Sequence, residues 1–169
     1  MLNKINFLFV TLFSIGKLPK IPGSYASLVT TLFLYFLFHY LLFPPNIFLY
    51  ILIIIFLISL ISINFFIKNL DNKDPKEIVI DEFIGQSIPL LAMINIKLKL
   101  KLISTPFMDY PTEIWILLSF VLFRFFDILK PFPINLIDKK FKNGFGIILD
   151  DIIAGVFTTI CIYIILSWI

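Results

Sequence analysis

Long apolar runs separated by short polar connections fill most of this chain. The five main runs are residues 28–43, 47–67, 78–96, 113–129 and 147–169. A run of about 20 apolar residues has the length of a helix that crosses a bilayer core of roughly 30 Å. The pattern therefore predicts an all-α integral membrane protein, a small helical bundle with about four to five membrane segments. The third segment contains charged side chains and a proline, so we leave open whether it spans the membrane or re-enters it.

Composition supports the same class of protein. Of the 169 residues, 60% are hydrophobic and 15% are charged, with a mean hydropathy of +1.02, whereas soluble domains carry about 25% charged residues. We expect a single membrane-embedded domain over residues 1–169. Residues 1–15 resemble a signal peptide but lack a small-residue cleavage site, which favours an interfacial or buried helix. The single cysteine, Cys161, excludes an internal disulfide and a cysteine-based metal site.

The formal net charge is +3, and the lysines are spread over the connecting segments. No basic stripe of the kind that binds nucleic acid is present, so we expect no nucleic-acid partner. With five membrane segments, most lysines fall on the side that holds the N-terminus, and the positive-inside rule makes that side cytoplasmic. The lysines of residues 97–101 are the exception. The sequence leaves the oligomeric state open.

Six of the eleven carboxylates lie in the apolar segments or beside them. They are Asp81, Glu82, Asp127, Asp138, Asp150 and Asp151. A charged group at membrane depth costs roughly 2.5–3.5 kcal/mol on insertion scales, so its presence points to function. In the five-segment topology, the acids of the last three segments and Arg124 occupy one layer near the cytoplasmic face. A divalent cation would relieve their mutual repulsion, and Mg²⁺ prefers oxygen ligands completed by water and phosphate.

Each acidic pair also has a simpler interpretation. Asp81 and Glu82 suit the first turn of a solvated helix, where the helix dipole favours negative charge. Asp150 and Asp151 suit a helix start that follows a turn at residues 143–146. For both pairs, the competing interpretation is metal ligation.

The basic residues near the acids have two interpretations as well. Arg124 and Asp127 stand three positions apart, so one interpretation is an ion pair on one helix face. The other is that Arg124 binds a phosphate through two parallel N–H donors. Lys130, at a predicted helix exit, is either a membrane-end charge or a second phosphate contact. Gly144 and Gly146 can expose backbone N–H groups to an anion at a helix N-terminus.

These residues belong to strings that resemble the phosphatidylglycerophosphatase A family. In the family's order, the strings are PKIPGSYASL (19–28), IVIDEFIGQ (78–86), FRFFDILKPFPI (123–134) with Asp138-Lys139, and GFGIILDDIIAG (144–155). Residues 22–27 read Pro-Gly-Ser-Tyr-Ala-Ser where the family usually shows Pro-Gly-Thr-x-Gly-Ser, and Ser14 and Asn143 stand where it usually shows glycine. These departures concern loop geometry, whereas all of the acids match.

The resemblance implies a Mg²⁺-dependent hydrolase that converts phosphatidylglycerophosphate to phosphatidylglycerol and phosphate. It also implies a small helical, multi-pass protein of the bacterial inner membrane. The lysine distribution predicts that the active site faces the cytoplasm. The implied metal ligands are Asp81, Glu82, Asp150 and Asp151. The implied phosphate-binding residues are Arg124, Lys130, Ser24, Gly144 and Gly146. The implied catalytic residues are Asp127, Arg124 and Lys130, where Asp127 orients Arg124, ligates the metal or acts as a base.

Other functions use a similar acidic cluster. A cation-coupled membrane transporter would carry acids near mid-membrane on discontinuous helices. A lipid headgroup phosphotransferase would carry a D-G-x-x-A-R-type pattern, which this sequence lacks. A purely structural membrane subunit would not need this many intramembrane acids.

Overall fold

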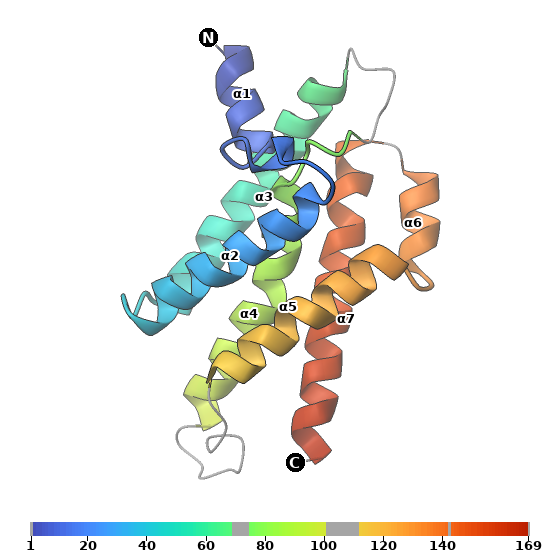
Figure 1. Ribbon diagram of the computed structural model, residues 1–169. Coiled ribbons are helices and arrows are strands. Elements are labelled where there is room, and N and C mark those ends of the chain that lie inside the picture. Colours follow the sequence, from blue (N-terminus) through green and yellow to red (C-terminus); the bar gives the residue numbers. More distant parts are fainter. Residues whose placement is uncertain (1, 69–74, 101–111, 142, 169) are drawn as a thin grey trace.

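The structure, a computed structural model, describes residues 2–68, 75–100, 112–141 and 143–168 (Figure 1). Its elements are α1 (Leu2–Val10), the short 3₁₀ helix η1 (Ile15–Lys17), α2 (Pro22–His39), α3 (Pro45–Ile67), α4 (Ile80–Leu100), α5 (Thr112–Leu129), α6 (Ile134–Lys140) and α7 (Gly144–Trp168). No β-strand occurs in the described residues. The predicted all-helical class is therefore confirmed.

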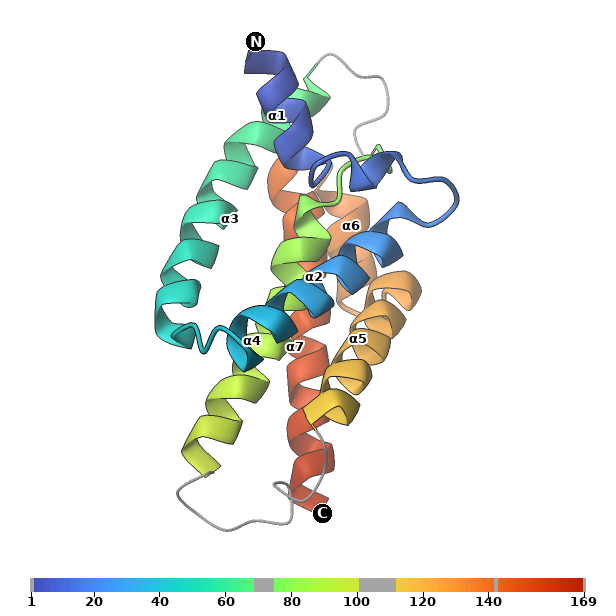
Figure 2. The ribbon, with the colours of Figure 1, turned by 60° about the vertical axis from the view of Figure 1, so that its left-hand side comes forward.

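The centre of the bundle is α4, which packs against α2, α3, α5 and α7. Two of these neighbours, α2 and α5, lie obliquely across the bundle, whereas α3 and α7 run lengthwise beside α4 (Figures 1 and 2). Near the N-terminus, α1 packs on α3, and α6 folds back against α7. One core cluster includes Leu34, Ile63, Leu90 and Ile148, which come from four different helices and are almost completely buried.

Proline and glycine set where three of the helices begin. Pro22 and Pro45 stand at the first positions of α2 and α3, where the missing N–H of proline leaves no helix bond unmade. The start at Pro22 precedes the predicted segment 28–43 and includes the Pro-Gly-Ser string within the helix. At the other end of the chain, α7 begins at Gly144, so the predicted turn at residues 143–146 is wrong.

The early start of α7 changes the position of its two acids. Asp150 and Asp151 lie in the second turn of the helix and are buried, so the interpretation of this pair as a helix start is wrong. Asp81 and Glu82 do lie in the first turn of α4. Their side chains are nevertheless largely buried, since Asp81 is 9% exposed and the Glu82 side chain is 14% exposed. Both pairs are therefore held inside the bundle.

Two described helices, α3 and α7, are long and apolar enough to cross a membrane, judged by length and composition alone. The third predicted segment forms one continuous helix, α4, with Pro89 in its interior. At 1.5 Å per residue, its 21 residues extend over about 31 Å. The number of membrane crossings and their orientation stay predictions.

Candidate active site

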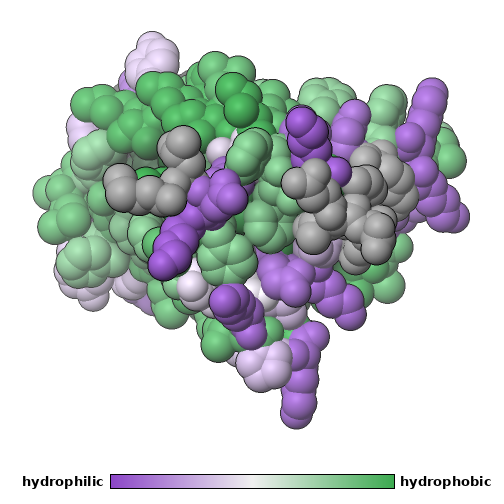
Figure 3. Space-filling model, turned by 90° about the horizontal axis from the view of Figure 1, so that it is seen from above, coloured by the Kyte–Doolittle hydropathy of each residue, from purple (hydrophilic) through white to green (hydrophobic). Residues whose placement is uncertain are grey.

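A pocket of about 510 Å³ lies where the ends of several helices meet. Its lining comes from the start of α2, the first turn of α4, the last turns of α5, the short helix α6 and the first two turns of α7. These segments converge in the half of the molecule that holds the N-terminus (Figure 1). Seen from above, this end of the molecule carries hydrophilic side chains among apolar surface (Figure 3).

Charged side chains dominate the lining of this pocket. Among the described residues that form it are six carboxylates, which are the six acids singled out in the sequence, and the four cations Lys20, Lys76, Arg124 and Lys130. Fully ionised, this set carries an excess of two negative charges. A single divalent cation balances that excess.

Three of the carboxylates converge on one point. Asp81, Glu82 and Asp151 each offer one oxygen atom, and these atoms lie within 4.8 Å of one another. Asp81 Oδ1, Glu82 Oε2 and Asp151 Oδ2 are buried and accept no hydrogen bond from the described residues. Buried acceptors normally have a donor or a cation as partner. The trio therefore offers carboxylate oxygens that lack hydrogen-bond donors, and such oxygens are suitable ligands for a hard cation such as Mg²⁺.

Arg124 lies beside this trio and is held from three sides. Its Nη1 atom forms an ion pair with Asp127 of the same helix and lies 3.9 Å from Glu82 Oε1. The same atom donates a hydrogen bond of 3.3 Å to Ser27 Oγ of α2. Arg124 Nε, although buried, has no acceptor among the described residues. The guanidinium is thus fixed beside the trio by the contacts of its Nη1 atom.

Lys130 also lines the pocket. Its Nζ donates hydrogen bonds to Asp138 Oδ1 of α6 at 2.8 Å and to Asp150 Oδ2 of α7 at 2.5 Å. Burial lowers the pKa of Lys130, but these two hydrogen bonds outweigh burial and raise the pKa above the usual lysine value. Lys130 therefore stays protonated and joins the end of α5 to both α6 and α7.

The remaining predicted site residues differ in whether they line the pocket and in whether they already have partners within the protein. Ser24 and Gly146 line the pocket. The N–H of Gly144 donates to Asn64 Oδ1, and the N–H of Gly146 donates to Asn143 Oδ1, each at 3.0 Å. Both backbone donors expected to face an anion thus already have acceptors within the protein. The resemblance implies four metal ligands, including Asp150. In the structure, Asp150 is paired with Lys130 and lies outside the converging trio.

Two functional contacts were not predicted from the sequence. Ser27 accepts the hydrogen bond from Arg124 and is completely buried; its position three residues after Ser24, on the same helix, was the available signal. The sequence singles out Asp138 as one of the six acids but assigns it no partner, and in the structure it pairs with Lys130. Ser27 and Arg124 are 97 positions apart in the sequence, whereas Asp138 follows Lys130 by eight positions across the turn between α5 and α6.

Gly23 explains how α2 comes so close to the acids. A Cβ atom at this position would overlap Glu82 Oε1 and would lie 3.3 Å from Arg124 Nη1. Any larger residue at the start of α2 would therefore displace the Glu82 carboxylate or the guanidinium. Glycine here permits a close approach between the first turns of α2 and the charged pocket.

The chain was compared with known proteins. The family described as "PgpA: Phosphatidylglycerophosphatase A" matches residues 8–166. Phosphatidylglycerophosphatase A of Haemophilus influenzae is 35% identical over 168 residues, which cover 99% of this chain and 92% of that protein. Phosphatidylglycerophosphatase A of Escherichia coli is 31% identical over 153 residues, which cover 90% of this chain and 78% of that protein. No solved structure matches the chain.

These matches cover the same four strings on which the resemblance rested, together with almost all of the chain between and around them. The expectation drawn from the motifs is therefore confirmed. The chain belongs to the phosphatidylglycerophosphatase A family.

Proposed function

We propose that this protein hydrolyses phosphatidylglycerophosphate to phosphatidylglycerol and phosphate, with Mg²⁺ held by the pocket acids. Membership of the phosphatidylglycerophosphatase A family supports the reaction. The observation that carries the site assignment is the convergence of the Asp81, Glu82 and Asp151 oxygens beside Arg124. Acids with unmet acceptors next to a fixed guanidinium suit a phosphate and a divalent cation together.

The cation would be held by Asp81, Glu82 and Asp151, because their oxygens converge and lack other partners. When bound there, Mg²⁺ supplies charge compensation for the phosphate and polarises its oxygens. Asp150 lies next to Asp151 in the sequence and pairs with Lys130. Its role would be to hold the Lys130 ammonium in position to bind the phosphate. In the hydrolysis itself, water attacks the phosphorus atom, the bond from phosphorus to the glycerol oxygen breaks, and that oxygen leaves with a proton.

Arg124 and Lys130 would bind the nonbridging oxygens of the phosphate and stabilise the charge that shifts during transfer. Asp127 forms an ion pair with Arg124, which supports the orienting role among the three roles considered for it. Ser24 lines the same pocket, and its hydroxyl would add one hydrogen bond to the phosphate. Gly146 has no side chain and would leave room for the phosphate at the pocket wall. Gly144 is the first residue of α7 and would help to position this helix and its acids.

The competing functions fit the pocket less well. A cation-coupled transporter needs acids along a path through the membrane, whereas the six described acids of the pocket gather at one end of the bundle. We further propose that α2, α3, α4, α5 and α7 all cross the bacterial inner membrane, with the pocket facing the cytoplasm. The distribution of lysines supports this orientation.

The test is phosphate release by protein purified in detergent. We expect release from phosphatidylglycerophosphate in mixed micelles when Mg²⁺ is present, and a fall to the background rate in EDTA that added Mg²⁺ reverses. Folded protein that releases no phosphate under these conditions would overturn the proposed function. Activity that persists in EDTA would overturn the metal assignment alone.

A further inference from the structure

A second cavity, of about 780 Å³, lies next to the charged pocket. The two cavities share part of their lining, namely Lys20, Pro22, Pro75 and Lys76. The rest of the second cavity comes from α1, η1 and Leu18 after it, the end of α3, and Glu77 in the segment before α4. A ligand that enters the charged pocket therefore borders a further space at the same end of the bundle.

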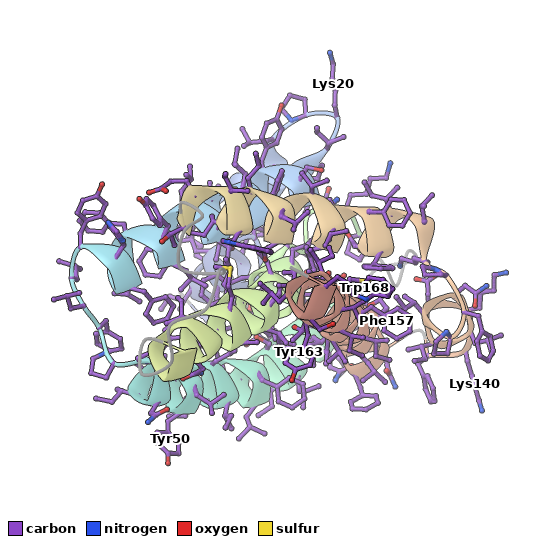
Figure 4. All side chains as sticks on the ribbon, turned by 90° about the horizontal axis from the view of Figure 1, so that it is seen from below. Lys20, Tyr50, Lys140, Phe157, Tyr163 and Trp168 are labelled. Atoms are coloured by element: carbon purple, nitrogen blue, oxygen red, sulfur yellow. The ribbon has the colours of Figure 1, made fainter. Side chains whose placement is uncertain are left out.

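The charge of this second cavity is opposite to that of the first. Its described lining contains Lys17, Lys20 and Lys76 but one acid, Glu77. Lys17 Nζ lies 4.5 Å above the centre of the Phe7 ring, which holds that ammonium against the cavity wall. Lys20 extends from the tip of the loop before α2 (Figure 4). No ion pair joins any of these lysines to an acid within the described part of the chain.

The other two cations of the first pocket, Arg124 and Lys130, differ in this respect. Arg124 is paired with Asp127, and Lys130 is paired with two acids. The uncompensated positive charge of the described site is thus concentrated at the border between the cavities and beyond it. An anionic group located there would be attracted without having to displace a carboxylate partner.

We infer that the second cavity binds the phosphodiester of the lipid substrate while the charged pocket holds the terminal phosphomonoester. This inference rests on the proposed function. The substrate carries both groups, joined by a three-carbon glycerol, and the shared lining of the two cavities provides adjacent subsites for them. Lys17 and Lys76 are the residues assigned to the diester, and Lys20 borders both subsites. These lysines determine specificity and take no part in bond breaking.

The experiment compares two inhibitors, each of which fits one subsite. Phosphatidylglycerol carries the diester without a monoester, and inorganic phosphate resembles the monoester without a diester. Inhibition constants for both are measured during hydrolysis of phosphatidylglycerophosphate, at a fixed total lipid fraction in neutral detergent. The variants are Lys17→Gln, Lys76→Gln and the double variant. All of these side chains are exposed, so the substitutions leave the core unchanged.

We expect each single variant to raise the inhibition constant of phosphatidylglycerol by roughly two- to fivefold, the range for exposed ion pairs, and the double variant to raise it by about tenfold. The inhibition constant of inorganic phosphate stays at the wild-type value. Lys140→Gln is the matched control, because Lys140 extends outward from α6 (Figure 4) and lines neither cavity. It changes the same charge and should leave both constants unchanged.

Three results would overturn the inference. The first is an unchanged inhibition constant for phosphatidylglycerol in the double variant. The second is an equal loss of affinity for both inhibitors, and the third is an equal effect of Lys140→Gln; the last two both indicate general attraction of anions. Wild-type protein that fails to hydrolyse phosphatidylglycerophosphate would instead reject the proposed function, so the two failures are distinguishable.

Discussion

Gly85 of α4 lies directly against Asp151 of α7. A Cβ atom at residue 85 would lie 2.7 Å from the Asp151 carbonyl oxygen and 2.9 Å from the Asp151 Cβ atom. At the same crossing, a Cβ atom at Gly155 would overlap the carbonyl oxygen of Gly85. Two glycines thus permit the close approach that places the acids of α4 beside the acid of α7. The geometry of the acidic trio is therefore set by backbone contact between α4 and α7 as well as by the acids themselves.

The first prediction concerns this crossing. Gly85→Ala should push α7 away from α4, because the added carbon meets backbone atoms that cannot move independently. We expect the Mg²⁺ concentration for half-maximal activity to rise and the rate to fall by about 10- to 100-fold. Val156→Ile adds one carbon at an exposed neighbouring position of α7 and should retain wild-type activity. Equal rates in the two variants would argue against the crossing as the determinant of the site.

The second prediction separates function from folding at the acidic trio. Asp151→Asn removes one charge from three crowded carboxylates, so repulsion in the metal-free protein decreases. We expect turnover to fall by at least about 100-fold, while the unfolding temperature in EDTA stays the same or rises. The readouts are phosphate release and thermal unfolding in detergent. Glu113→Gln, which changes an acid that bonds Tyr35 outside the pocket, should keep activity.

The third prediction tests the support of Arg124 by α2. Ser27→Ala removes the acceptor of the 3.3 Å hydrogen bond from Arg124. Since a single hydrogen bond contributes about 1 kcal/mol, we expect kcat/KM to fall roughly fivefold. Ser87→Ala is the control, because Ser87 and Ser27 are both buried and donate to the carbonyl four residues earlier. If the two variants lose the same activity, Ser27 acts only through helix packing.

The fourth prediction follows from the raised pKa of Lys130. Burial opposes the charged form, but the hydrogen bonds to Asp138 and Asp150 outweigh it, so the folded-state pKa exceeds the unfolded value. The pairing therefore stabilises the fold fully below the ordinary lysine pKa and is lost only as pH rises through the folded-state pKa. Lys130→Gln should lower the unfolding temperature throughout pH 6–9, as measured by thermal unfolding in detergent.

The double variant Lys130→Gln/Asp138→Asn should recover part of this loss, because it leaves fewer unpaired carboxylates. Lys130→Arg should retain most of the stability, since arginine keeps the charge. Between pH 6 and 9, the pH–rate profiles of the wild type and Lys130→Arg should have the same shape, with no titration step in the wild type that the variant lacks. A step of that kind would mean that Lys130 loses its proton within this range.

The sequence predicts the helices and the six pocket acids well, and it does so for physical reasons. Apolar runs of this length can be recognised as helices without knowing which other helices they pack against. An acid inside such a run costs free energy at any depth, so its presence stands out in the sequence. The start of α7 was predicted too late because Gly144 and Gly146 were interpreted as turn residues. In the structure, Gly144 begins the helix with its N–H bonded to Asn64.

The pairing of charges could not be predicted in the same way. Asp150 and Asp151 are neighbours in the sequence, yet one pairs with Lys130 and the other joins the trio. Which acid faces which partner depends on the rotation of α7 about its own axis, and this rotation is set by packing at Gly85 and Gly155. The spacing of Ser24 and Ser27 places both on one face of α2, but the contact of Ser27 with Arg124 depends on the crossing of α2 and α5, which neither helix specifies alone.

The contact between Asn64 and Gly144 has a consequence for α3. Among the described residues that line the charged pocket, none comes from this helix, and none of its residues is charged. It is bonded through one amide to the first residue of the helix that carries Asp150 and Asp151. Bilayer thickness or tension that tilts α3 would therefore be transmitted to the acids of the charged pocket, so the lipids that surround the protein would tune turnover without themselves occupying the site.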